Sequence, residues 1–290
     1  MTTTWYRLAM AQNQYALSER LIRAISGWTM NPQDTVESLI AEGADINRTH
    51  GTLLPLHCAC MSRDSECVKL LLKSGAEVNR VDGYERTAIH YAAEKDPACL
   101  CVLLENGAEI NCRDGNYDTP LHWACFRNNV ECAKLLLEHN ALVDALDFNH
   151  DTPLSWASLK GNLECMMLLL EYGAETHTTN CNGLSPLHRA CSMFALGLSG
   201  ERDRQCLNIL SQATGQIDLR DHKGEFPRVI NDDSELKAII TGICCSPRLL
   251  RQLCRYKIRQ SLIGGNRQKL MGQLPLPAPL QRYLLFQNGE

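Results

Sequence analysis

Residues 114–146 read DGNYDTPLHWACFRNNVECAKLLLEHNALVDAL, and this stretch decides the fold. A turn-prone head leads into two short segments whose apolar residues follow helical spacing. Thr119 can cap the first helix through its hydroxyl, and Pro120 suits the first helical position, where its missing N–H costs nothing. The second segment stops at Asn140, a residue type that tolerates the left-handed backbone of helix C-termini. The stretch is therefore predicted to fold as a helix–turn–helix unit.

The same unit recurs along the chain. One position holds histidine in four copies and serine in one, at steps of 33, 32, 33 and 33 residues: His57, His90, His122, Ser155 and His188. The position that ends the second helix recurs at steps of 32, 33 and 33 residues: Gly75, Gly107, Asn140 and Gly173. Two independent positions with one period indicate tandem repeats. A single unit cannot bury its apolar face alone, so the copies are predicted to stack.

A period of about 33 residues with a T-P-L-H-x-A core resembles the ankyrin repeat. The resemblance implies an all-α fold, an ankyrin-repeat solenoid of helix–turn–helix repeats, over residues 31–232 with degenerate first and last copies. Residues 1–30 lie outside the period. In that region Ser18, followed by Leu21 and Ile25, predicts a capped amphipathic helix that covers the first repeat.

The last full copy carries an insertion. His188 and Cys206 are 18 residues apart, whereas the equivalent His122 and Cys132 are 10 residues apart. The additional residues fall within 193–203 and are expected to lengthen the connection between the two helices of that copy.

Composition and charge exclude several function classes. Of the 290 residues, 44% are hydrophobic and 21% are charged, which is ordinary for a soluble globular protein. The net charge of −4 and the pI near 6.1 give no global basic field that would favour nucleic acid. Residues 1–17 have neither a basic lead nor a continuous apolar core, and no run of 18 apolar residues occurs. We therefore expect a cytosolic or nuclear protein with no membrane partner.

The 15 cysteines are unusual in number. Four of them share one repeat position, eight residues before the helix-ending Gly or Asn: Cys67, Cys99, Cys132 and Cys165. This position favours small buried hydrophobic residues, and stacked repeats would separate its members too far for a disulfide or a shared metal. The odd total and the lack of paired CxxC motifs favour a reducing compartment. Neither a metal site nor a cofactor is expected.

A cysteine-dependent enzyme is one alternative, and it requires an exposed thiol of low pKa beside a histidine. The local candidates are His57 with Cys58 and His177 with Cys181, and neither pair has an orienting acid at a useful spacing. The histidines that recur in the repeats are interpreted as structural, with each imidazole bridging the heads of two repeats. Ser155 is interpreted as a substitution in that column, because no acid–base partner recurs with it. No catalytic residue is predicted.

The pattern changes after residue 245. Ser246-Pro247 reads as a helix start, and an apolar stripe follows it: Leu249, Leu250, Leu253, Cys254 and Ile258. A second motif comes later in the chain: Leu274, Pro275, Leu276 and Pro277. A module this short seldom forms a stable hydrophobic core by itself. The apolar stripe therefore indicates an amphipathic helix that binds in a groove of a partner protein. A plainer alternative is a further helix pair that caps the repeats.

These two motifs resemble those of a SOCS box. Leu250-x3-Cys254-x3-Ile258 looks like its elongin-binding segment, and the LPLP motif looks like its cullin box. The resemblance implies a three-helix SOCS box over residues 246–290, after a linker at 233–245. It also implies that the apolar stripe binds elongin C, in complex with elongin B, and that the LPLP motif selects cullin-5 with its RING-box protein.

The whole chain thus resembles the ankyrin repeat and SOCS box family. The resemblance implies a non-catalytic substrate receptor of a ubiquitin ligase, which binds a protein substrate through its ankyrin repeats. The main alternative is an ankyrin scaffold or inhibitor that binds partners without elongin. A nucleic-acid role for the basic residues of the C-terminal module is disfavoured, because no aromatic residue beyond Tyr256 is interleaved with them.

In ankyrin arrays the residue after the repeated histidine faces the concave side. By this resemblance, aromatic and apolar residues of repeats three to five are candidates for substrate binding: Tyr91, Trp123, Phe126, Trp156 and Leu159. Consensus ankyrin repeats also tolerate aromatic residues there, so a role in the scaffold remains an alternative.

Overall fold

The computed structural model describes residues 2–28, 31–194, 201–214, 219, 226, 228–232, 234–245, 258 and 273–284. Within these residues the regular elements are all α-helices, and the only extended pairing is an isolated bridge between His50 and Leu53. The prediction of an all-α ankyrin solenoid is confirmed. None of the described helices is both long and apolar enough to cross a bilayer. The chain divides into two compact units, Met1–Trp123 and Ala124–Glu290, and the division falls within helix α7, Pro120–Phe126.

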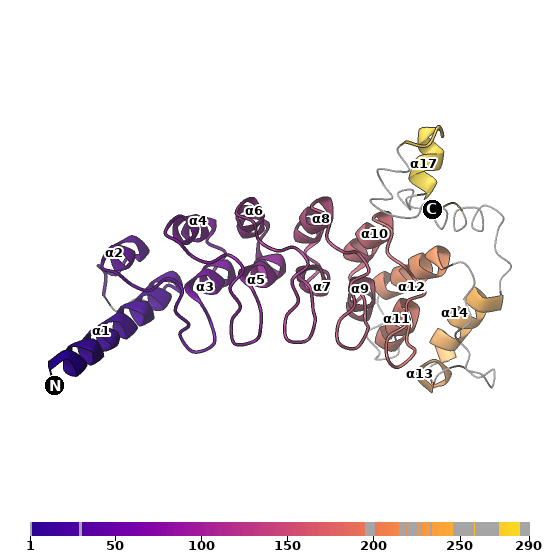
Figure 1. Cartoon of the computed structure of the whole chain (residues 1–290). Helices are drawn as coiled ribbons and strands as arrows, with labels where there is room; N and C mark the ends of the chain where they lie inside the picture. Colours follow the sequence, from indigo (N-terminus) through magenta and orange to yellow (C-terminus); the bar gives the residue numbers. More distant parts are fainter. Residues whose placement is uncertain are drawn as a thin grey trace. The chain divides into compact units, whose positions relative to one another are not determined.

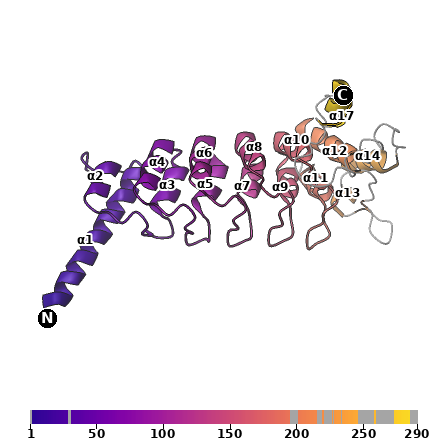
Figure 2. The same ribbon diagram turned by 45° about the horizontal axis from the view of Figure 1, so that its top comes forward.

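Unit 1 contains the N-terminal helix and the first repeats. Its helices are α1 (Thr2–Ile25), α2 (Val36–Ala41), α3 (Pro55–Met61), α4 (Ser65–Lys73), α5 (Ala88–Lys95) and α6 (Pro97–Glu105). Helix α3 packs on α5 and α4 packs on α6, so the first and second helices of the repeats form two rows within this unit (Figure 1). The long loops between repeats protrude on the side of α3 and α5 (Figure 2). Fully buried side chains fill the space between the rows: Leu71, Ile89, Leu100 and Leu103.

Local sequence signals explain where the second helices begin and end. The Asp96 carboxylate accepts a 2.8 Å hydrogen bond from the Cys99 N–H at the start of α6, and Asp64 accepts one of 2.9 Å from Cys67 at the start of α4. The column that ends these helices has a positive φ, as predicted for Gly107 (82°) and Asn140 (69°).

Unit 2 contains the later repeats and the C-terminal helices. Beyond the last residues of α7, its helices are α8 (Val130–Glu138), α9 (Pro153–Lys160), α10 (Leu163–Glu171), α11 (Pro186–Phe194), α12 (Glu201–Ala213), α13 (Arg228–Asn231), α14 (Ser234–Cys245) and α17 (Ala278–Leu284). Helix α9 packs on α10 and α11, and α10 packs on α8 and α12. Their core is again fully buried: Leu136, Leu154, Met166 and Leu169.

Two expectations about boundaries require correction. Ser18 does not begin a helix, because α1 starts at Thr2 and Ser18 is buried within it, where its hydroxyl donates to the Asp45 carbonyl. The expected linker at 233–245 is largely helix α14, whose Leu236 and Ile240 are fully buried. The insertion within 193–203 lengthens the connection as expected, because α11 ends at Phe194 and α12 begins at Glu201, whereas α9 ends at Lys160 and α10 begins at Leu163. It also lengthens the second helix, since α12 has 13 residues where α4, α6, α8 and α10 each have 9.

Candidate protein-binding surfaces

The repeated histidines hold neighbouring loops together. The Thr87 N–H donates to His90 Nδ1 at 3.1 Å, and His90 Nε2 lies 3.1 Å from the Asp118 carbonyl oxygen. Because a backbone N–H can only donate, Nδ1 must be the unprotonated nitrogen, and Nε2–H then donates to that carbonyl. Burial lowers the pKa of His90 and of His188. These contacts support the structural interpretation of the histidine column.

His57 departs from this pattern in one respect. Its Nε2 lies 3.0 Å from the Arg86 carbonyl oxygen, but no described residue forms a hydrogen bond with its buried Nδ1. The later repeats have threonine or serine three residues before the column position, whereas this repeat has Leu54. Burial lowers the pKa of His57 to about 4. The imidazole is therefore neutral at physiological pH.

The aromatic residues that follow the histidine column brace the loops through their polar edges. The Tyr91 hydroxyl donates to Asp82 Oδ2 at 2.7 Å, and the Trp123 indole N–H donates to Asp114 Oδ2 at 3.2 Å. In unit 2, the Trp156 indole N–H donates to Asp147 Oδ2 at 2.9 Å. Each aspartate lies nine residues before its ring in the sequence.

The second oxygen of each aspartate holds its own loop. Asp114 Oδ1 accepts hydrogen bonds from the backbone N–H groups of Asn116 (2.9 Å) and Asp118 (3.0 Å), and Asp147 Oδ1 accepts from Asn149 and Asp151 in the same way. This bracing was not predicted, although the aspartates recur at steps of 32 and 33 residues and so carry the repeat period in the sequence.

In unit 1 the aromatic side chains that were predicted to bind a substrate are largely covered by the protein itself. Tyr91 is only 6% exposed, which leaves little of its ring for a partner. The Arg86 guanidinium carbon lies 3.9 Å from the centroid of the half-buried Trp123 ring, and Arg86 Nε pairs with Asp114 at 3.1 Å. These contacts therefore support a role for Tyr91 and Trp123 in the scaffold more than a role in substrate binding.

In unit 2 the aromatic residues form a surface that carries positive charge. The rings of Phe126 and Trp156 meet edge to face, with centroids 5.4 Å apart. Lys160 Nζ lies 4.5 Å from the Phe126 centroid, and the Arg127 guanidinium carbon lies 5.5 Å from it. Leu159 is half-buried on the same helix as Trp156. We refer to Phe126, Arg127, Trp156, Leu159 and Lys160 as the basic–aromatic patch.

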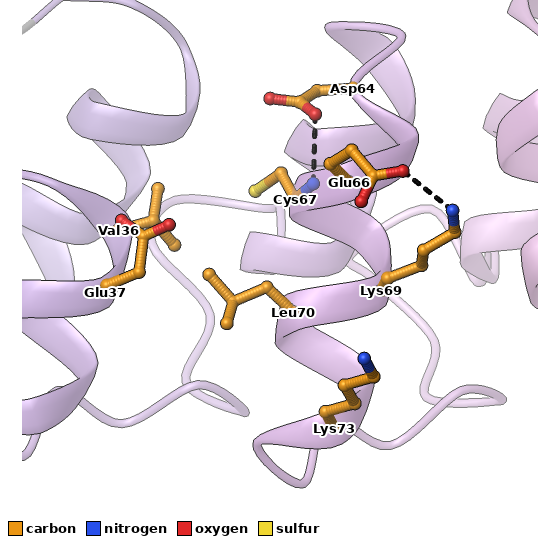
Figure 3. Close-up of a pocket in the computed structure, with 8 residues that line it drawn as sticks. All are labelled: Val36, Glu37, Asp64, Glu66, Cys67, Lys69, Leu70 and Lys73. Carbon is orange, nitrogen blue, oxygen red and sulfur yellow. Dashed lines mark hydrogen bonds and ion pairs between the residues drawn. The ribbon is translucent and has the colours of Figure 1, made fainter.

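A groove in unit 1 was not predicted from the sequence. It has a volume of about 350 Å³ and lies between the start of α2 and helix α4, lined by Val36, Glu37, Asp64, Glu66, Cys67, Lys69, Leu70 and Lys73 (Figure 3). Helix α2 has 6 residues whereas α4 has 9, so the degenerate first repeat leaves part of α4 uncovered. Leu70 lies in the gap, and the Glu66 and Lys69 side chains pair at 2.7 Å on the rim.

The C-terminal motifs share one small core. Leu284 is buried, and the partly buried Ile258, Leu274 and Leu276 pack against it. The alternate positions of the LPLP motif point outward, because Pro275 and Pro277 are exposed. The remaining predicted elongin-binding residues lie outside the described part of the chain: Leu249, Leu250, Leu253 and Cys254.

The cysteines of the repeated column lie in the core, whereas Cys181 is exposed. The four members of the repeated column are 7% exposed or less: Cys67, Cys99, Cys132 and Cys165. Burial raises the pKa of Cys58 to about 11, which is the opposite of what a nucleophilic thiol beside His57 would need. Within the described residues, no cluster of three or more His, Cys, Asp or Glu side chains is arranged to hold a metal.

Comparisons with known proteins agree with this architecture. The family model for ankyrin repeats in three copies matches residues 21–114, 96–180 and 143–221, and the SOCS box model matches residues 246–285. The chain is similar to proteins named Ankyrin repeat and SOCS box protein 8 from Mus musculus, Bos taurus and Homo sapiens. The identity to each is 60% over 285 residues, which covers 98% of this chain and 99% of the relative.

Proposed function

Because this chain belongs to the ankyrin repeat and SOCS box protein family, a family of substrate adaptors, we propose that it is the substrate-recognition subunit of an elongin B/C–cullin-5–RING ubiquitin ligase. The observation that carries the proposal is the SOCS box match at residues 246–285, C-terminal to an ankyrin array. The chain would do no bond chemistry itself. It would hold a target protein near the charged ubiquitin carrier and so raise the effective concentration of the target lysine.

The arrangement of the C-terminal module supports a division of roles. Ile258, Leu274 and Leu276 pack around Leu284, so their side chains hold the module together. Pro275, Pro277 and Leu280 (50% exposed) present an apolar surface suited to the cullin. By resemblance to the family's motif, the stripe that contains Leu250 and Cys254 would enter the elongin C pocket. The ligase would work in the cytosol or nucleus.

Co-expression with elongin B and elongin C tests the first contact. We expect a 1:1:1 complex that is lost in Leu250→Pro and Cys254→Phe variants, because both changes disrupt the apolar stripe. If the folded full chain purified from this co-expression without elongin B and elongin C, the proposal would be refuted. Such a result would favour the alternative of an ankyrin scaffold or inhibitor, which requires no elongin.

The cullin contact is tested separately with exposed positions of α17 and the LPLP motif. The double variant Pro277→Asp/Leu280→Asp should retain elongin but lose cullin-5 with its RING-box protein, because it places charge on the apolar surface without entering the Leu284 core. Arg282→Gln is the matched control, because Arg282 is also exposed on α17 but lies two residues from Leu280 and so on another side of the helix. Cullin-5 binding by the Asp double variant at the level of the parent would contradict the assignment.

A further inference from the structure

The groove between α2 and α4 leaves apolar surface of the first full repeat open (Figure 3). Leu70 lies in the groove and is only half-buried, whereas Val102, the equivalent residue of α6, is 6% exposed. The neighbouring helix explains the difference, because α6 has the 9-residue α4 beside it and α4 has only the 6-residue α2. Val36 is half-buried on the α2 side of the groove. An aliphatic side chain of a partner could therefore bury further apolar area between Leu70 and Val36.

The carboxylates of the groove are not all neutralised within the protein. Glu66 pairs with Lys69 at 2.7 Å, and its pKa is lowered mainly by Lys69 and to a smaller extent by Lys73. Among the described residues, no Lys, Arg or His pairs with Glu37 or Asp64. The two ammonium groups that line the groove thus both act on Glu66, and the negative charge of the other two carboxylates favours a cationic partner.

These two carboxylates act on the same part of the groove. Burial first, and then the negative charges of Asp64 and Glu37, raise the pKa of the Cys67 thiol to about 12. Cys67 itself lines the groove. A cation bound beside this thiol would therefore be attracted by both carboxylates.

The walls of the groove are fixed before a partner binds. Asp64 Oδ1 accepts a 2.9 Å hydrogen bond from the Cys67 N–H, which holds this carboxylate at the start of α4. At the start of α2, Thr35 and Ser38 form a capping box in which each hydroxyl accepts a 3.1 Å hydrogen bond from the backbone N–H of the other. The box fixes the turn that carries Glu37. A surface that is already ordered loses little conformational entropy on binding, so more of the interaction energy is available as affinity.

We propose that the groove between α2 and α4 binds a segment of a partner protein in which a lysine or arginine is adjacent to a leucine or another aliphatic residue. The cation would pair with Glu37 and Asp64, and the aliphatic side chain would pack between Leu70 and Val36. The volume of about 350 Å³ is near the lower end of the range for ligand sites, about 300–1,000 Å³, and suits a short segment. The binding is independent of the proposed function, because the groove contains no residue of the SOCS box match or of the basic–aromatic patch.

Fluorescence anisotropy of the full chain, purified from the co-expression with elongin B and elongin C, tests this inference. The probes are a labelled peptide in which arginine–leucine pairs are separated by serines, its version with glutamate for arginine, and its version with serine for leucine. We expect the first peptide to bind saturably and more tightly than the other two, with an affinity that falls as salt is added. Equal affinity for the glutamate peptide, or no saturable binding of the arginine peptide, would overturn the proposal.

The variant Glu37→Gln/Asp64→Asn removes both free carboxylates and should weaken binding of the arginine peptide by about fivefold or more. Asparagine is also a good N-cap residue, so the start of α4 is kept. Glu105→Gln/Glu131→Gln is the matched control, because it changes the net charge by the same amount at exposed positions of α6 and α8. The control should bind the peptide as the parent does, and an equal loss in the control would contradict a specific role for the groove.

The variant Leu70→Arg tests the apolar part of the groove. Its guanidinium would pair with Glu37 and Asp64 and fill the gap itself, so the arginine peptide should no longer bind. Far-UV circular dichroism and thermal unfolding check that each variant is folded, and analytical ultracentrifugation measures the mass of each. Equal binding by the parent and either groove variant would overturn the proposal. Self-association of the parent that Leu70→Arg abolishes would overturn it too, because the groove would then belong to a second copy of this chain.

Discussion

The imidazole of His57 makes the stability of the repeats depend on pH. Burial lowers its pKa to about 4 in the folded chain, whereas a histidine in the unfolded chain titrates near about 6.5. Protons therefore bind the unfolded chain more tightly, and the stability that is fully present above about pH 6.5 is lost as the pH falls towards 4. We expect the free energy of unfolding to fall by about 3 kcal/mol over this window from His57 alone, measured by urea denaturation.

A His57→Gln variant separates this contribution from the other titrating groups. It should be less stable than the parent at pH 7.5, because it disturbs the contact with the Arg86 carbonyl oxygen, but its stability should decline less steeply between pH 6.5 and 4. If the variant and the parent lost stability in parallel as the pH falls, the pKa of His57 would not be lower in the folded chain than in the unfolded chain.

The aromatic side chains show how far single residues could be predicted. The sequence placed Tyr91, Trp123 and Trp156 at one repeat position, and each makes the same hydrogen bond to an aspartate of its own loop. Their exposure was not predictable from that position, because it depends on neighbours in space. Arg86 covers the Trp123 ring, whereas Phe126 meets the edge of Trp156.

Gly107 and Gly242 together test whether the turn that ends the second helix of a repeat needs a left-handed backbone. A Cβ added at Gly107 or at Gly242 would meet nothing within 4 Å, but Gly107 has a φ of 82° and Gly242 lies inside α14. Gly107→Ala should destabilise the chain by about 1 kcal/mol, because an L-residue is strained in the left-handed region. Gly242→Ala should stabilise it by roughly 0.5–1 kcal/mol, because alanine loses less entropy in a helix. Chemical denaturation of both variants measures the two shifts, and shifts of the same sign would contradict the assigned backbone strain.

The helices that follow the repeat period were predictable, whereas α14 and the start of α1, which lie outside the period, were not. Caps such as Asp96 and turn residues such as Gly107 are short-range signals, so they could be read from the sequence. The helical state of 234–245 depends on burying Leu236 and Ile240 against other elements, which short-range signals do not report. The groove between α2 and α4 likewise results from the length of a neighbouring helix.

The two proposed sets of binding residues for the ligase role do not overlap in sequence. The basic–aromatic patch lies within residues 126–160, and the SOCS box match covers residues 246–285. Each set has its own support, since Asn162 and Asp147 fix the patch whereas Leu284 packs with Ile258, Leu274 and Leu276. Because the supporting contacts are separate, a surface change in one set should leave the other intact.

We therefore expect reciprocal behaviour from two variants of the full chain. Phe126→Ala/Leu159→Ala should lose the target protein and still bind elongin B and C with cullin-5, because both side chains lie outside the SOCS box match at residues 246–285. Pro277→Asp/Leu280→Asp should bind the target protein as the parent does and lose cullin-5. Co-purification of the target protein and of cullin-5 with each variant measures both properties. If either folded variant lost both kinds of binding, the target surface and the ligase-docking surface would have to be coupled, and the adaptor could not be treated as two independent binding surfaces.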